Sequence, residues 1–170
     1  MYLNLDKPLI GFWIVLVCPW LLPAIPARRA LKTAVLTLLG TCVVCMTLAV
    51  SLGVTGWSAK WPAQGWLWLL NNLLLVTLTE ELFFRAYLQG GLQRILHRLP
   101  HAPTLALCVA SLLFGLAHLG GGWQWALLAG IAGIGYGLAY RFGGLQAAVV
   151  THFGLNLVHF SLFTYPMFDR

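Results

Sequence analysis

Long apolar stretches, separated by short segments that hold most of the charge, dominate the chain. A transmembrane helix needs about 20 mostly apolar residues. The stretches that meet or approach this length are residues 8–27, 33–54, 65–95, 104–119, 123–140 and 145–163. The pattern therefore predicts an all-α fold, a polytopic membrane bundle of about six transmembrane helices, in a single domain that covers residues 1–170.

Prolines and glycines mark where several of these helices end or pack. Pro19, Pro23 and Pro26 predict that the first helix is kinked or ends early. The fifth helix carries small residues at nearly every fourth position, a spacing that lets two helices approach closely: Ala126, Gly130, Gly133 and Gly137. An incidental glycine-rich helix is the alternative explanation of this spacing.

Composition agrees with a membrane protein, because 60% of the residues are hydrophobic and 8% are charged, against about 25% charged in an average soluble domain. The net charge of +6 is explained by Lys and Arg in short connecting segments, and no basic stripe interleaved with aromatics suggests nucleic acid. One predicted side carries Arg28, Arg29, Lys32, Arg94, Arg98 and Arg141, and the other carries Lys7, Lys60 and Arg170. We therefore expect a multi-pass protein of the cell (inner) membrane, with both termini outside the cytoplasm.

Two of the four acidic residues, Glu80 and Glu81, lie side by side within the third apolar stretch. An ionised residue in the centre of a membrane helix costs about 2.5–3.5 kcal/mol on insertion scales. Such a pair is therefore predicted to be functional.

Other polar groups in the apolar stretches follow helical spacings. Glu81 and Arg85 are four residues apart and can meet on one face of a helix. The same spacing joins Phe114 to His118 and His152 to Asn156, and His159 continues the last face. Three helices are thus predicted to present polar groups to a common interior. Asn71 and Asn72 are interpreted as helix–helix contacts or caps, and Cys42 and Cys45 as packing residues.

This arrangement suggests a division of roles. Glu81 and Arg85 would form a buried ion pair, which leaves Glu80 to take a proton from water. His118 could hold that water or carry the proton, and His152 and Asn156 could donate to a developing oxyanion. Plain packing remains the alternative for Phe114, and a hydrogen-bonded core histidine for His159. Counting about 1.5 Å per residue puts His118 roughly 10 Å closer to the outer surface than Glu80.

Three motifs carry a family resemblance, and they are Glu80-Glu81-xxx-Arg85, Phe114-xxx-His118 and His152-xxx-Asn156. In this order they resemble EExxxR, FxxxH and HxxxN of the CAAX prenyl protease and bacteriocin-processing (Abi) family of glutamic intramembrane proteases. The resemblance covers about residues 72–158, within a catalytic core of about residues 65–163.

The resemblance implies a conical intramembrane cavity, with Glu80 as general base, His118 on the water, and His152 and Asn156 as oxyanion hole. It assigns Glu81 and Arg85 supporting roles and requires no metal or other cofactor. Two Glu and two or three His could bind zinc, although no HExxH motif is present.

The expected substrate is a membrane-anchored protein or peptide. The short chain resembles compact bacterial members of the family, thought to process C-terminal sorting tags such as those of the JDVT-CTERM type. A non-catalytic bacteriocin-immunity or peptide-binding scaffold, or a small proton-coupled transporter, is the alternative. The sequence predicts no oligomeric state.

Overall fold

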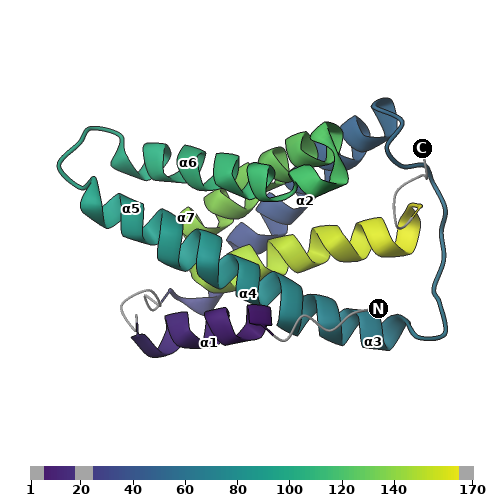
Figure 1. Ribbon diagram of the computed structural model, residues 1–170, viewed down its shortest axis with the longest axis horizontal. Coiled ribbons are helices and arrows are strands. Elements are labelled where there is room, and N and C mark those ends of the chain that lie inside the picture. The colour runs from purple at the N-terminus through teal and green to yellow at the C-terminus, as the bar shows by residue number, and fades with distance from the viewer. Residues whose placement is uncertain (1–5, 18–24, 165–170) are drawn as a thin grey trace.

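The computed structural model describes residues 6–17 and 25–164, and these are almost entirely helical (Figure 1). Its elements are α1 (Asp6–Val17), α2 (Ala27–Ser51), α3 (Gly65–Asn71), η2 (Asn72–Thr77), α4 (Leu78–Glu81), η3 (Leu82–Gln89), α5 (Gly90–Ile95), α6 (Ala102–Ala117), η4 (Leu119–Gly121) and α7 (Trp123–Leu162). Within the described ranges no strand occurs, and Trp57 and Phe163 form an isolated antiparallel bridge. The predicted all-α class is confirmed.

The third predicted helix is present at its predicted bounds, as one continuous helical segment from α3 to α5. Two parts of it, η2 and η3, are π-helical, and the short α4 lies between them. Because π-helical turns widen the backbone at particular positions, they occur frequently at functional sites.

Helix α7 turns back on itself at Gly144, whose φ of 75° is left-handed and suits a residue without a Cβ. The rings of Tyr136 and His152 stack 4.3 Å apart, and those of Trp125 and His159 lie 5.9 Å apart. Each pair is spaced nearly symmetrically about Gly144, so the two halves of α7 run antiparallel (Figure 1). They correspond to the fifth and sixth predicted helices.

The beginning of the chain departs from the prediction. Helix α2 begins at Ala27, directly after Pro26, and ends at Ser51, so Arg28, Arg29 and Lys32 lie in its first turns instead of in a loop. No proline follows Pro26 within α2, so nothing prevents the helix from beginning there. Helix α1 is described only as far as Val17, and Pro19 and Pro23 lie outside the described residues.

The surface of the bundle is that of a membrane protein. Three described helical segments are long and apolar enough to span a bilayer, 27–51, 65–95 and 123–162, and α6 is a shorter apolar helix. The outer face of α2 exposes large apolar side chains, among them Leu31, Leu36, Leu39 and Val43, at 60–66%. Its buried residues are small, such as Ala34 and Ala49. Large apolar residues outside and small ones inside are what helices packed in lipid require.

The predicted close approach through small residues is confirmed between α6 and the first half of α7. A Cβ on Gly115 of α6 would lie 2.8 Å from the carbonyl oxygen of Ala126 and 3.1 Å from the Cα of Gly130. Gly133 is similarly close to Ser111, at 3.2 Å. The two backbones therefore touch, which fixes the position of the end of α6.

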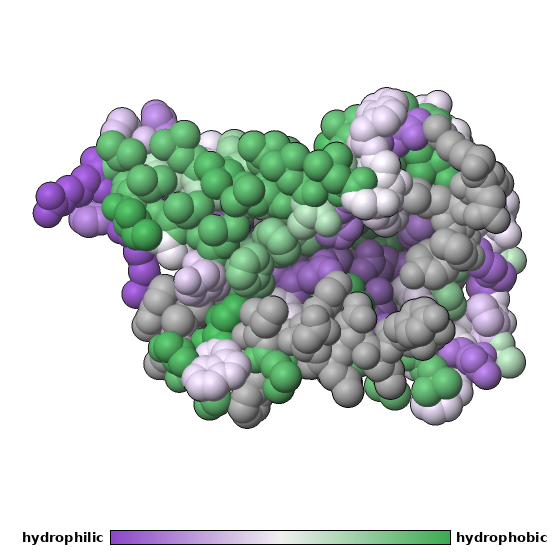
Figure 2. Space-filling model, in the orientation of Figure 1, coloured by the Kyte–Doolittle hydropathy of each residue, from purple (hydrophilic) through white to green (hydrophobic). Residues whose placement is uncertain are grey.

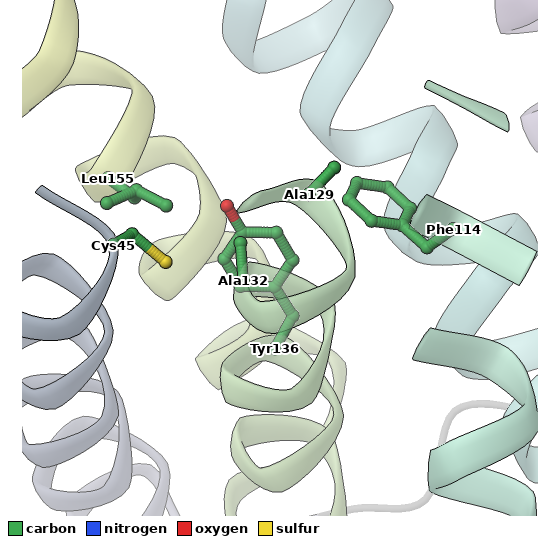
Figure 3. Packing of buried hydrophobic residues seen from close by; sticks show 6 residues of the cluster. All are labelled: Cys45, Phe114, Ala129, Ala132, Tyr136 and Leu155. Atoms are coloured by element: carbon green, nitrogen blue, oxygen red, sulfur yellow. The ribbon is translucent and has the colours of Figure 1, made fainter. Parts of the chain in front are cut away.

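The apolar core joins α2, α6 and both halves of α7. It is formed by Cys45, Phe114, Ala129, Ala132, Tyr136 and Leu155 (Figure 3). Figure 3 shows the Tyr136 ring between Phe114 on one side and Cys45 with Leu155 on the other. Cys42 packs against the same cluster, so the interpretation of Cys42 and Cys45 as packing residues is confirmed.

Candidate active site

The glutamate pair lies on α4, between the two π-helical segments. Glu81 is fully buried, whereas Glu80 is half-buried. Adjacent residues on a helix point about 100° apart, so the two carboxylates enter different surroundings.

Glu81 forms the ion pair that its spacing from Arg85 predicts. The Nε of Arg85 lies 3.3 Å from the Oε2 of Glu81, and both side chains are completely buried. Among the described residues, the two terminal nitrogens of Arg85 have no hydrogen-bond partner. The guanidinium instead lies against aromatic faces, 4.7 Å from the ring centre of Phe114 and 5.4 Å from that of Tyr136. Cation–π attraction therefore stabilises a charge that the ion pair alone does not satisfy.

Glu81 also holds His152, a contact that joins α4 to the second half of α7. The Nδ1 of His152 lies 2.8 Å from the Oε1 of Glu81. Because an ionised carboxylate only accepts hydrogen bonds, Nδ1 carries a hydrogen and donates it. One face of the His152 ring stacks on the ring of Tyr136 at an interplanar angle of 12°. The imidazole is thus fixed in position, with its Nε2 as the remaining polar atom.

His118 follows the last residue of α6 and is fixed in a similar way. Its Nδ1 lies 2.7 Å from the carbonyl oxygen of Phe114, to which it donates. In a neutral imidazole this leaves the Nε2 lone pair to accept a hydrogen bond from water. The ring centre of Phe114 lies 4.5 Å from that of His118 and 5.8 Å from that of His152, so Phe114 is next to both imidazoles.

Asn156 is positioned by a residue of the third predicted helix. Its Nδ2 donates to the Oδ1 of Asn72 at 3.2 Å, and the hydroxyl of Thr77 donates to the same oxygen, also at 3.2 Å. Asn72 is therefore a helix–helix contact, as predicted, but it also orients a candidate site residue. The sequence did not single out this role, nor the stacking of Tyr136 on His152.

The two histidines and Asn156 line one cavity of ≈ 70 Å³, which has room for a few water molecules. His159 and Phe114 also line it, and the remaining walls are mostly apolar: Cys45, Met46, Ala49, Val54, Thr55, Trp125, Leu128, Ala129, Ala132, Tyr136 and Leu155. Figure 2 shows hydrophilic surface in a hollow beneath the apolar side of α6. His118 was expected to lie roughly 10 Å closer to the outer surface than Glu80. It nevertheless lines the same cavity as His152.

The glutamates themselves are not among the described residues that line this cavity. Glu81 lies behind His152, which lines the cavity, and Glu80 is the adjacent residue on α4.

His159 combines both interpretations that the sequence left open. It is buried, its Nε2 lies 3.2 Å from the carbonyl oxygen of Thr164, and it lines the cavity near Trp125. It therefore serves as a hydrogen-bonded core residue and as part of the cavity wall.

Residues 6–17 and 25–164 contain no cluster of three or more His, Cys, Asp or Glu side chains arranged to hold a metal ion. Of the motif residues, Phe114, His118, His152 and Asn156 line the cavity, and Glu81 is joined to it through its hydrogen bond with His152.

Residues 61–158 match the model of a protein family described as "Rce1-like: Type II CAAX prenyl endopeptidase Rce1-like". The match covers more than half of the 170 residues and includes all three motifs, from Glu80 to Asn156. No curated protein and no solved structure matches the chain.

Proposed function

The chain belongs to the Rce1-like family of type II CAAX prenyl endopeptidases, and we propose that it hydrolyses a peptide bond within the membrane by a glutamate-activated water. The observation that carries this proposal is that His118, His152 and Asn156 line one cavity, with Glu81 hydrogen-bonded to His152 and Glu80 next to Glu81 in the chain. These are the residue types that amide hydrolysis requires: a base, a group that holds water and donors for an oxyanion.

Glu80 is the proposed general base, because it is half-buried, whereas Glu81 is completely buried in its contacts with Arg85 and His152. Glu80 takes a proton from a water held by the Nε2 of His118, and the resulting hydroxide attacks the carbonyl carbon of the substrate. The tetrahedral intermediate then breaks its C–N bond, and the proton passes from Glu80 to the departing amine. This sequence consumes one water and leaves the enzyme unchanged.

The oxyanion of the intermediate would be held by two donors from the second half of α7. One hydrogen of the Asn156 amide bonds to Asn72, and the other is available. His152 already donates from Nδ1, so it can donate from Nε2 only as an imidazolium. Because the proposed scheme uses no metal ion, the reaction is expected to resist chelators.

The proposed substrate is a membrane-anchored protein or peptide, cut at a C-terminal sorting or anchor segment. The cavity opens among the mostly apolar residues of α2, α6 and α7, which suits an apolar segment that arrives from the bilayer. The cell membrane is the proposed location.

Reconstitution of the full chain in liposomes with a membrane-anchored reporter tests the proposal. The reporter carries a C-terminal helix and a basic tail, and cleavage is followed by mass spectrometry. Glu80→Gln is expected to lower the rate by about 10²–10⁴-fold, the usual contribution of a general base. His118→Ala and Asn156→Ala should also lower it strongly, whereas the exposed His101→Ala should not.

Equal cleavage by the wild type and Glu80→Gln would contradict the assignment of the base. A non-catalytic scaffold predicts that Glu80→Gln keeps full function in cells, and a proton-coupled transporter predicts proton flux without any cleavage. The same assay with 1,10-phenanthroline tests the metal-free mechanism, for which the rate should not change.

A further inference from the structure

A second cavity, of ≈ 430 Å³, lies at the other end of the bundle from the candidate active site. It is lined by Arg29 of α2, Arg94 of α5 and Arg141 of α7, together with Gln93, Tyr140 and Phe142. Arg29 and Cys45 both lie on α2, 16 positions apart, so the two cavities are separated by about 24 Å along that helix.

The sequence assigns these three arginines to the cytoplasmic side, and the structure places them on three different helices. Here they meet around one space, although they are far apart along the chain. None of the described residues that line this cavity is acidic. The positive charges of Arg29 and Arg141, which both line the cavity, would attract an anion into it.

The guanidiniums of Arg29 and Arg141 are each fixed by one hydrogen bond, and each has further N–H donors. The Nε of Arg29 donates to the carbonyl oxygen of Phe142 at 2.8 Å, and the Nη1 of Arg141 donates to the hydroxyl of Thr104 at 3.1 Å. Each arginine has five N–H donors in a planar fork, which matches the oxygens of a phosphate group. These bonds fix the side chains and leave the other donors for a ligand.

We propose that this cavity binds the phosphate of an anionic phospholipid headgroup. Apolar side chains border the arginines and offer contact to acyl chains: Ile25, Pro103 and Phe142 line the cavity, and the exposed Ile95 adjoins Arg94. Basic pockets between helices on the cytoplasmic side are the type of site that binds such headgroups. A soluble phosphate shares the chemistry of the headgroup but would gain nothing from the apolar border.

The test uses the full-length protein, purified in neutral detergent with phosphatidylglycerol or phosphatidylcholine added, and measures retained lipid by native mass spectrometry. Wild type is expected to retain phosphatidylglycerol at least tenfold more than phosphatidylcholine. Arg94→Gln and Arg141→Gln should each lower phosphatidylglycerol retention by about fivefold, the factor expected for one basic residue near an anionic lipid. Arg98→Gln is the matched control, because Arg98 is exposed and is assigned by the sequence to the same side of the membrane, but it does not line the cavity.

Three results would overturn the proposal. They are equal retention of the two lipids, an equal loss in Arg98→Gln, and displacement of phosphatidylglycerol by millimolar inorganic phosphate, which would indicate a site for a soluble anion. Thermal melting in neutral detergent checks the fold of each variant. If Arg141→Gln does not fold, Arg141→Lys keeps the charge without the fork, and unchanged retention in both Arg141→Lys and Arg94→Gln would also overturn the proposal.

Discussion

At the scale of single residues, the carboxylate of Glu81 is the point on which the site depends. It pairs with Arg85 along its own helix and accepts a hydrogen bond from His152 across to α7. All three side chains are buried. If either Glu81 or Arg85 is removed, water therefore cannot compensate the charge of the other. Glu81 therefore couples the stability of the bundle to the orientation of a catalytic candidate.

Glu81→Gln is expected to destabilise the protein by about 3–5 kcal/mol, because it leaves the Arg85 guanidinium buried without its counter-ion. Denaturation in mixed micelles, followed by circular dichroism, measures the change. Glu80→Gln is the matched control: Glu80 is half-buried, and its replacement should change stability by less than about 1 kcal/mol while it lowers the cleavage rate by about 10²–10⁴-fold. Similar stabilities for the two variants would show that Glu81 is not the structural carboxylate.

Contacts between neighbouring turns of one helix were predictable from the sequence, whereas the partner of a given residue on another helix was not. The Glu81–Arg85 pair follows from a spacing of four residues. The Asn72–Asn156 hydrogen bond and the Tyr136–His152 stack join residues that no local spacing relates. A single sequence contains no signal that would pair them. Only the structure therefore shows that Asn72 and Tyr136 hold the candidate site residues in place.

At the scale of the elements, the contact between α6 and α7 sets the position of His118. Helix α6 ends at Ala117, so His118 extends directly from its end and moves with it. The sequence predicted a close approach of small residues on α7 but did not identify Gly115 of α6 as the opposing residue. The depth of His118 expected from helix length also assumed that the helices run parallel to the membrane normal. His118 and His152 line the same cavity, so this assumption does not hold for both helices.

Gly115→Ala should separate these helices, because the new Cβ would lie 2.8 Å from a backbone oxygen that cannot move aside. Overpacking of this kind costs about 1–3 kcal/mol, and we expect a lower melting temperature together with slower cleavage. Gly40→Ala in α2 is the control, since nothing lies within 4 Å of its Cβ position and alanine favours the helix. Unchanged melting and cleavage in Gly115→Ala would mean that α6 can shift without cost.

At the scale of the whole molecule, the bundle has two chemically different ends. Arg29, Arg94 and Arg141 surround a basic cavity at one end. The α2–α3 connection, which contributes Val54 and Thr55 to the apolar walls of the candidate active site, lies at the other end (right in Figure 1). The α5–α6 turn lies on the left in the same view. Because basic segments stay in the cytoplasm, this polarity predicts which side each end faces.

The active-site cavity is therefore expected to open toward the non-cytoplasmic side, where a sorting segment of an exported protein would be cut. Single cysteines test this orientation after Cys18, Cys42, Cys45 and Cys108 are replaced by alanine. Ala59→Cys and Leu99→Cys place exposed thiols at the two ends of the bundle. In intact bacterial cells a membrane-impermeant maleimide should label Ala59→Cys but not Leu99→Cys, and lysis should make both reactive. The opposite labelling would place the cavity on the cytoplasmic side, and substrates would then have to be sought among proteins anchored there.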